Sequence, residues 1–173
     1  MIIGIDIDDT ICNTKELQRI YWKEYFNNNK CSEFSEELPM EVNYFNIPYI
    51  DEFWNTYRFK LFNPSIKEDV VNVINEFREL GFKFVIVTSR PPEVYDDLNG
   101  KIKKWLDSEN LYVDDIFTGV RDKGQFILDN NIDILIDDDI RHVSRARELG
   151  KDVIHFTDDM TWLKVKDILK EYL

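Results

Sequence analysis

Short apolar runs recur along the chain and predict the strands of a buried sheet. They are rich in Ile, Val and Phe and occupy residues 2–7, 84–87, 116–117, 132–136 and 153–156. Continuous apolar runs, without polar residues at alternate positions, are typical of parallel strands that are covered on both faces. From residue 65 onward, stretches with helical spacing lie between these runs. This alternation predicts an α/β protein with a three-layer, Rossmann-like fold, in which a mostly parallel sheet has helices on both faces.

The first of the predicted helices has start and stop signals in the sequence. Ser65 and Glu68 form a capping-box pattern that predicts its first turn, and Gly81 is a typical residue just beyond a helix end. Between them, apolar residues at helical spacing predict one buried stripe, formed by Ile66, Val70, Val73, Ile74, Phe77 and Leu80. Further helices are predicted over residues 98–106, 141–150 and 162–173.

An inserted segment separates the first strand from the rest of the sheet. Residues 14–62 are helical in pattern and hold more than half of the chain's aromatic residues. The composition changes at Asn63 and Pro64. We therefore predict two parts, a Rossmann-like core formed by residues 1–13 and 63–173 and a helical segment of residues 14–62 inserted after the first strand.

Charge and composition narrow the range of partners. The 173 residues carry a net charge of -12 at pH 7, so repulsion disfavours nucleic acid polymers and anionic membrane surfaces. A small anionic substrate stays compatible, because a divalent cation and a few basic groups can reverse the local potential. Cys12 and Cys31 lack metal-ligand spacing and predict free thiols in a reducing compartment. The sequence shows no signal peptide or membrane span, so we expect a cytoplasmic protein. Both a monomer and a homodimer remain open.

Polar and charged side chains gather where the predicted strands end. The first strand ends in Asp6 and Asp8, and Lys123 precedes the fourth strand. The remaining strand-end groups are Thr88, Ser89 and Arg90 after the second strand and Asp137, Asp138 and Asp139 after the fourth. In open parallel sheets, ligands bind beyond the carboxyl ends of the strands. The sequence therefore predicts one polar site at this edge of the sheet.

The acidic residues at this edge predict a magnesium site. Asp6 and Asp8 are two residues apart in an extended segment, so their carboxylates point the same way. Two close like charges need a cation beside them, and Asp138 would supply a further oxygen from a neighbouring strand. Oxygen ligands without a His or Cys cluster favour Mg²⁺ over zinc.

Each of these clusters, taken alone, also has a structural explanation. Aspartates at loop ends often cap helices, and we predict that role for Asp9 and Asp139, with Thr10 as a further candidate. A single lysine such as Lys123 is more often solvated than bound. The occurrence of acids, a hydroxyl and a lysine at successive strand ends is what favours a reactive site.

Four motifs resemble those of the haloacid dehalogenase (HAD) superfamily phosphatases. Residues 4–10, Gly-Ile-Asp-Ile-Asp-Asp-Thr, are similar to the first motif, and residues 85–89 resemble the second, a strand that ends in Thr or Ser. Lys123 lies where the third motif has its basic residue. Residues 134–138 resemble the fourth motif, a strand that ends in paired acids.

A narrower resemblance is to the 5′(3′)-deoxyribonucleotidase group. It rests on the Thr-Ser pair at 88–89, the Arg-Asp-Lys run at 121–123 and the Leu-Ile-Asp-Asp run at 135–138. The chain departs from that group at Arg90-Pro91-Pro92 and over most of residues 14–62. Because the inserted segment shapes the substrate pocket in such proteins, the substrate is the least determined part of the prediction.

The resemblance implies a phosphatase that forms an aspartyl-phosphate. Asp6 would attack phosphorus, and Asp8 would protonate the leaving oxygen and then deprotonate the attacking water. Mg²⁺ would be held by Asp6, by the backbone carbonyl of Asp8 and by Asp138, with Asp137 as a neighbour that can exchange roles with Asp138. The phosphoryl oxygens would be bound by Thr88, Ser89 and Lys123. Since dehalogenases usually lack the second aspartate, Asp8 favours phosphate chemistry.

The same resemblance implies that residues 14–62 form a cap that closes over the site and selects the substrate. We expect most of its aromatic residues to form the cap's own core, with Phe53 and Trp54 as candidates for stacking on a nucleobase. The predicted activity is that of a 5′-nucleotidase acting on (deoxy)nucleoside monophosphates. A phosphatase for another small phosphate ester, a phosphotransferase and a phosphomutase remain open.

A receiver-like signalling domain is the alternative from a different class, because it also places acids, a Thr and a Lys around Mg²⁺. The order of the groups argues against it: a receiver has its acceptor aspartate on the third strand and its lysine last. A non-catalytic binding relative is disfavoured because every motif position is filled. The motifs leave no role for His142 and His155, which we predict to be structural or surface residues.

Overall fold

Five parallel strands form the centre of the structure, a computed structural model in which residues 1–29 and 50–173 are described. The strands are β1 (Ile2–Ile5), β2 (Lys83–Val87), β3 (Asp115–Phe117), β4 (Ile134–Asp137) and β5 (Asp152–His155). Their order across the sheet is β3-β2-β1-β4-β5, and every neighbouring pair is parallel. The predicted α/β fold with a parallel sheet is therefore confirmed, and β1 is its central strand.

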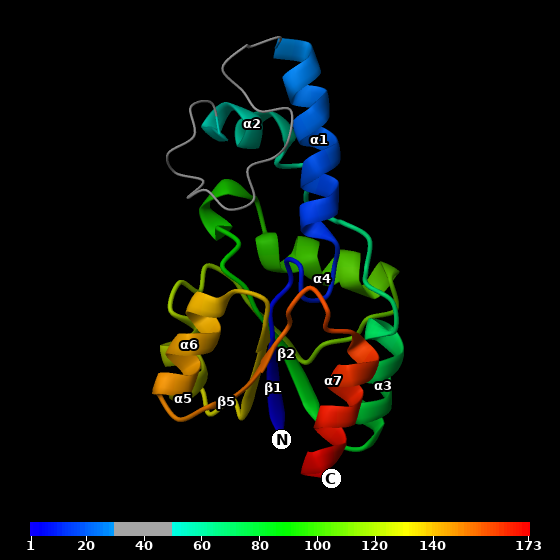
Figure 1. Ribbon diagram of the computed structural model, residues 1–173, viewed down its shortest axis with the longest axis vertical. Coiled ribbons are helices and arrows are strands. Elements are labelled where there is room, and N and C mark those ends of the chain that lie inside the picture. Colours follow the sequence, from blue (N-terminus) through cyan, green and yellow to red (C-terminus); the bar gives the residue numbers. More distant parts are fainter. Residues whose placement is uncertain (30–49) are drawn as a thin grey trace. The chain divides into compact units, whose positions relative to one another are not determined.

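Helices cover both faces of this sheet (Figure 1). On one side lie α5 (Lys123–Asp129) and α6 (Ile140–Glu148), and on the other lie α3 (Val70–Glu79) and α7 (Trp162–Leu169). Between residues 66 and 173 the structure also contains α4 (Leu98–Ser108) and two short 3₁₀ helices, η2 (Pro92–Val94) and η3 (Lys170–Tyr172). The last predicted helix, over residues 162–173, thus ends at Leu169 and continues as a 3₁₀ turn.

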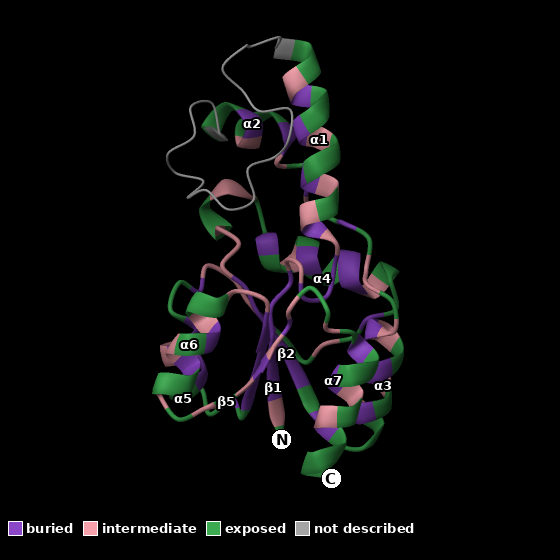
Figure 2. Cartoon of the chain, viewed as in Figure 1, coloured by how far each residue is buried: buried purple, intermediate pink, exposed green. Residues whose placement is uncertain are grey.

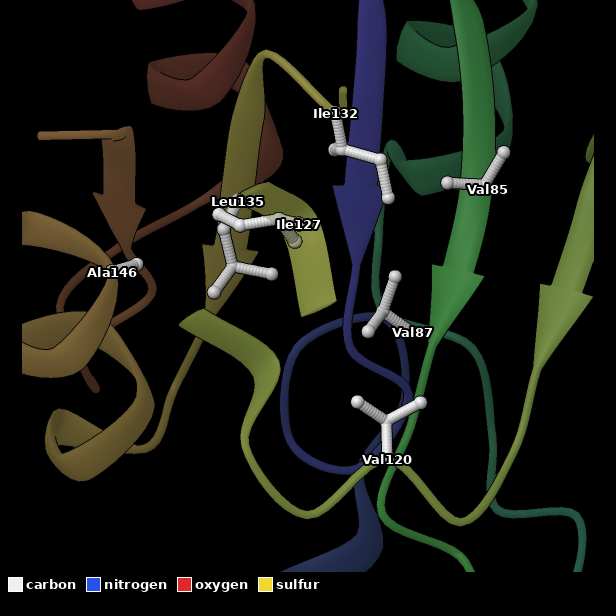
Figure 3. Packing of buried hydrophobic residues seen from close by; sticks show 7 residues of the cluster. All are labelled: Val85, Val87, Val120, Ile127, Ile132, Leu135 and Ala146. Carbon is white, nitrogen blue, oxygen red and sulfur yellow. The ribbon is translucent and has the colours of Figure 1, made fainter. Parts of the chain in front are cut away.

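The apolar runs pack as the strand pattern requires. Side chains of β1, β2 and β4 are buried along the strands (Figure 2). One cluster between the sheet and α5–α6 joins two strands, two helices and two loops, and comprises Val85, Val87, Val120, Ile127, Ile132, Leu135 and Ala146 (Figure 3). Burying one large aliphatic side chain stabilises a fold by about 1.5–3 kcal/mol. This packing fixes the strands in register and so fixes their ends.

The predicted start of the first helix of the core is wrong. Helix α3 begins at Val70, after Asp69, and no side chain caps it. Ser65 instead accepts a hydrogen bond from the Asn13 side chain at 3.1 Å, and Ile66 pairs with Cys12 in an isolated bridge. These contacts between segments distant in sequence take up the residues of the predicted capping box.

The remainder of the α3 prediction holds with one exception. Val70, Val73, Ile74 and Phe77 are buried as expected. Leu80 is 53% exposed, because it is the residue that follows the last helical turn. Gly81 has a φ of 89°, the left-handed conformation that favours glycine just beyond a helix.

The chain divides into two compact units. Unit 1 consists of Met1–Cys12 and Ile66–Leu173 and contains the sheet, and unit 2 consists of Asn13–Ser65. Unit 2 holds α1 (Thr14–Asn29) and α2 (Ile50–Tyr57). The division predicted from the sequence, with residues 14–62 as a cap, remains a prediction as far as the cap's role is concerned.

Aromatic residues form the core of unit 2. The buried members of this cluster are Trp22, Tyr25, Phe53, Tyr57 and Leu61. Phe53 meets Trp22 edge-on with ring centroids 5.1 Å apart, a favourable arrangement for aromatic pairs. Many of the aromatic residues of this segment therefore stabilise it internally, as expected. Cys31, Phe34, Tyr44, Phe45 and Tyr49 lie outside the described residues. No helix in the described ranges, 1–29 and 50–173, is long and apolar enough to cross a membrane.

Candidate active site

Two aspartates meet at the carboxyl ends of neighbouring strands. Asp6 follows β1 directly and its backbone N–H donates to the carbonyl of Ile136 at 2.9 Å, which extends the pairing of β1 with β4. Asp137 is the last residue of β4 and is completely buried, while Asp6 is 5% exposed. Because the two strands are parallel and in register, both carboxylates emerge at the same edge of the sheet.

Asp138 completes a group of three acids. One carboxylate oxygen each from Asp6, Asp137 and Asp138 can be chosen so that all three lie within 4.8 Å of one another. Asp138 is half-buried and follows β4. Side-chain oxygens grouped in this way fit a hard divalent cation such as Mg²⁺, which takes oxygen ligands and retains several waters. The structure thus brings together three of the acids named from the sequence, whereas the Asp8 carboxylate is outside this group and pairs with Arg90.

Lys123 joins the two buried acids. Its ammonium nitrogen Nζ lies 2.5 Å from Oδ1 of Asp6 and 2.7 Å from Oδ2 of Asp137. The sequence placed this side chain at the phosphoryl oxygens, and the structure shows it between two carboxylates with 2% of the side chain exposed. A fully buried lysine is tolerated only when it is paired.

The ionisation of this group follows from its burial and its charges. Burial lowers the pKa of Lys123, but the carboxylates of Asp6 and Asp137 outweigh that effect and hold the pKa above its ordinary value. Burial raises the pKa of Asp6 well above its usual range, and the lysine opposes that rise while Asp137 and Asp8 add to it. The lysine is therefore charged, and a second cation beside Asp6 would favour its carboxylate form.

The start of α5 positions Lys123. Asp122 caps the helix by accepting a hydrogen bond from the backbone N–H of Gln125 at 2.9 Å, so the lysine occupies the first helical position. Gly124 lets α5 approach α6 closely, because a Cβ at this position would lie 2.9 Å from the backbone nitrogen of Ala146. The sequence reasoning named Asp122 only as part of a motif and did not use Gly124.

The two hydroxyl residues after β2 have different partners. Thr88 is buried, and its Oγ1 accepts a hydrogen bond from the backbone N–H of Arg90 at 3.2 Å. The Ser89 hydroxyl donates its proton to the carbonyl of Val120 at 2.8 Å. A hydroxyl has one proton to donate. Ser89 therefore supports the neighbouring loop in this conformation, whereas the Thr88 hydroxyl accepts only and keeps its proton for another acceptor.

Arg90 is the residue of this site that sequence reasoning missed. Its Nη2 and Nε donate to Oδ1 and Oδ2 of Asp8 at 2.8 and 3.0 Å, which is a two-point ion pair. The sequence analysis listed Arg90 among the strand-end groups and as a departure from a motif, but assigned it no role. Its position two residues beyond Thr88, at the end of a strand next to that of Asp8, was the available signal.

The residues around Asp137 and Asp138 hold these acids in place. Asp137 Oδ1 accepts from the backbone N–H of Asp139 at 2.8 Å. Asp139 caps α6 by accepting from the backbone N–H of Arg141, which confirms its predicted structural role. The Nε2 atom of His155 lies 3.1 Å from the carbonyl oxygen of Asp138. His155 thus has a structural contact, as predicted, although that contact is made at the site.

The predicted helix-capping roles of Asp9 and Thr10 are wrong. The next helix, α1, begins only at Thr14. Asp9 has a φ of 59°, a left-handed conformation suited to a tight turn. The hydroxyl of Thr10 is buried and has no hydrogen-bond partner, while its carbonyl accepts from the indole N–H of Trp162 at 3.0 Å. The turn after β1, rather than a helix, occupies these residues.

The two candidate pocket residues lie in unit 2. Phe53 is 1% exposed and belongs to the aromatic core described above, and Trp54 is partly buried and packs against the same cluster. This placement gives Phe53 a structural role. Contact of either ring with a substrate stays a prediction.

Comparisons with known proteins concern the fold. No protein-family profile matches the chain, and no curated protein matches it in sequence. Solved structures do match: a predicted phosphatase from Clostridium acetobutylicum has a TM-score of 0.70 at 16% identity, with 98% of each chain covered. A HAD-superfamily hydrolase from Ehrlichia chaffeensis has a TM-score of 0.60 at 13% identity, with coverage of 98% of this chain and 95% of that one.

A third structure contains a metal. A protein from Bacillus subtilis assigned as a HAD-hydrolase, in a crystal structure bound to magnesium, has a TM-score of 0.65 at 14% identity and covers 92% of this chain and 90% of its own. At such identities a match establishes the fold. The chain therefore has the fold of HAD-like hydrolases, in agreement with the Rossmann-like α/β fold predicted from the sequence.

Proposed function

We propose that this chain is a magnesium-dependent phosphomonoesterase that passes through an aspartyl-phosphate on Asp6. The observation that carries the proposal is the convergence of Asp6, Asp137 and Asp138 within 4.8 Å, beside the buried ammonium group of Lys123. Structural neighbours that include a predicted phosphatase support the same class of reaction. The predicted sequence motifs fall at these residues.

The roles of the residues follow from their positions. A carboxylate oxygen of Asp6 would attack phosphorus while the Thr88 hydroxyl donates to a phosphoryl oxygen. Asp8 would give a proton to the leaving oxygen and later take one from the water that hydrolyses the intermediate. Lys123 would neutralise negative charge at Asp6 and at the transferring group. When bound, Mg²⁺ would supply further positive charge against the phosphoryl oxygens.

The contacts of Asp137 separate its role from that of Asp138. Both oxygens of Asp137 already accept hydrogen bonds, one from Lys123 and one from the backbone of Asp139. We therefore assign Asp137 to the positioning of Lys123, and assign direct metal ligation to Asp138 and Asp6. The backbone carbonyl of Asp8 is the third protein ligand in this proposal.

For the substrate, we propose a (deoxy)nucleoside monophosphate. The support is the motif resemblance to 5′(3′)-deoxyribonucleotidases at residues 88–89, 121–123 and 135–138. Another small phosphate ester is the alternative within the same chemistry. The receiver-like alternative is less well supported, because Asp6 follows the central strand β1, while Thr88 follows the adjacent strand β2 and Asp137 ends the adjacent strand β4.

The direct test is phosphate release by the wild type and by Asp6→Asn in the presence of Mg²⁺. We expect the substitution to abolish turnover, because an amide cannot form the covalent intermediate. Asp158→Asn, a change at an exposed aspartate of unit 1, is the matched control and should retain wild-type activity. Substantial activity of Asp6→Asn would contradict the mechanism.

The substrate proposal has its own test. A panel of nucleoside monophosphates and sugar phosphates should give a higher kcat/KM for the nucleotides. Equal or higher values for sugar phosphates would refute the nucleotidase assignment and leave the phosphatase assignment in place.

A further inference from the structure

The ion pair between Arg90 and Asp8 has a geometry that orients the carboxylate. Two nitrogens of the guanidinium bind the two oxygens of Asp8 at 2.8 and 3.0 Å. A fork of this kind fixes both the position and the plane of a carboxylate, which a single-point contact with an ammonium group does not do. The plane of the Asp8 carboxylate is therefore set by Arg90.

Arg90 is itself held from more than one side. Its backbone N–H donates to the Thr88 hydroxyl, and its guanidinium carbon lies 5.4 Å from the ring centroid of Trp105 on α4. The side chain of Arg90 is 10% exposed, whereas that of Asp8 is 35% exposed. Burial lowers the pKa of Arg90, but Asp8 outweighs that effect and raises it. The charged and largely buried side chain of Arg90 thus binds the partly accessible carboxylate of Asp8.

This arrangement restrains a carboxylate that stays partly accessible. Asp8 must meet a leaving oxygen and then a water, so it has to stay accessible and yet point in one direction. The pair with Arg90, a residue of the loop that follows β2, restrains the rotamer of the Asp8 carboxylate. The backbone N–H of Arg90 also donates to the Thr88 hydroxyl, so one residue contacts both Asp8 and Thr88.

We propose that Arg90 is a positioning residue that holds the Asp8 carboxylate for proton transfer to the leaving group. The inference rests on the proposed phosphatase function and extends it by one residue. Its consequence is selective: loss of Arg90 should slow reactions that need a proton on the leaving oxygen, and should spare those whose leaving group departs as a stable anion.

The experiment compares phenyl phosphate with p-nitrophenyl phosphate, two substrates of similar shape whose leaving groups differ in basicity. Kinetics with Mg²⁺ would be measured for the wild type, Arg90→Ala and Arg90→Lys, each also in the Asp8→Asn background. Arg121→Ala is the matched control, since Arg121 is an exposed arginine, 71% accessible, on the loop before α5. Circular dichroism would verify that each variant is folded.

We expect Arg90→Ala to lower kcat for phenyl phosphate about 10- to 100-fold more than for p-nitrophenyl phosphate, a part of the total effect of a general acid. Arg90→Lys should recover only a fraction, because it keeps the charge without the fork. In the Asp8→Asn background, removing Arg90 should have little further effect, since the group it positions is already lost. Arg121→Ala should match the wild type.

The possible failures can be told apart. If the wild type releases phosphate from neither substrate, both the proposed phosphatase function and the positioning role of Arg90 are refuted. If the wild type is active but Arg90→Ala slows both substrates equally, or slows the Asp8→Asn enzyme as much as the wild type, Arg90 has a structural or binding role and only the positioning inference is overturned. Should Arg90→Ala not fold, the same comparisons with Arg90→Lys decide the question.

Discussion

The ammonium nitrogen of Lys123 lies 2.7 Å from a carboxylate oxygen of Asp137, and neither side chain reaches the surface, with exposures of 2% and 0%. Asp6 lies on the other side of the same ammonium group. Buried charges of this kind depend on one another, because each would be costly alone. The first predictions follow from this dependence.

Lys123→Met should unfold more easily than the wild type. The substitution keeps the volume of the side chain but leaves two buried acids without their cation, so we expect a loss of about 3–5 kcal/mol in the free energy of unfolding. Urea unfolding at neutral pH measures this loss. Mg²⁺ should restore part of the stability of the variant, because it replaces some of the missing positive charge. A variant as stable as the wild type would show that the three groups do not form a charged cluster.

Asp137→Asn and Asp138→Asn should affect different properties. Without Mg²⁺, Asp137→Asn should lower the stability by about 1.5–3 kcal/mol, because it weakens a charged hydrogen bond to Lys123. Asp138→Asn should change the metal-free stability little and should abolish the increase in Tm that Mg²⁺ produces in the wild type. Thermal unfolding at several Mg²⁺ concentrations distinguishes the two. An exchange of these phenotypes would assign direct metal ligation to Asp137.

Thr88 and Ser89 should contribute unequally to activity. The Thr88 hydroxyl accepts a hydrogen bond from the backbone of Arg90 and still has its proton to donate. The Ser89 hydroxyl already donates its proton to the carbonyl of Val120. We therefore expect Thr88→Val to lower kcat about 10²- to 10³-fold, as for the loss of a transition-state donor, and Ser89→Ala to have a much smaller effect. Thr88→Ser, which keeps the hydroxyl, is the control and should recover most of the activity. Comparable losses in Thr88→Val and Ser89→Ala would show that both hydroxyls bind the phosphoryl group.

The cap of α5 should make stability depend on pH in one direction. The backbone N–H of Gln125 and the guanidinium of Arg145 hold the pKa of Asp122 below its ordinary value. A carboxyl whose pKa is lower in the folded state stabilises the fold at pH values above its unfolded pKa of about 4, and this stabilisation is lost as the pH falls through the folded value. Asp122→Ala should therefore cost about 1 kcal/mol at pH 7.

The same difference between Asp122→Ala and the wild type should shrink as the pH falls below 4. Asp122→Asn, which keeps an oxygen acceptor for the Gln125 N–H, should lose less stability than Asp122→Ala at pH 7. Urea unfolding at pH 7 and pH 3.5 checks both expectations. A difference that stays constant over this range would show that the ionised cap contributes nothing beyond its shape.

The sequence was sufficient for the sheet and for the acids. Apolar runs mark parallel strands whose carboxyl ends lie at one edge, so the strand pattern places Asp6 and Asp137 at the same edge of the sheet. Their direct adjacency depends on the pairing of β1 with β4. Their distance from Lys123 could not be predicted in the same way. That contact depends on the start of α5 at residue 123 and on the close approach of α5 to α6 at Gly124, which are matters of packing.

Failures of the sequence prediction have the same origin. Ser65 has the local pattern of a helix start, but its hydroxyl is bound by Asn13, and the helix begins at Val70. Arg90 has no local pattern that distinguishes it from a surface arginine, and its partner Asp8 is far away in sequence. Local patterns identify elements and their ends, whereas pairings between distant residues appear only once the strands are ordered.

The strand order has a consequence for the chain during its synthesis. Asp6 is made early, yet the groups that would make it reactive come from β2, from α5 and from the end of β4, most of the chain later. A nascent polypeptide that stops short of β4 would lack Asp137, one of the two carboxylates that Lys123 contacts. The buried group of Asp6, Lys123 and Asp137 can therefore form only after β4 has been synthesised.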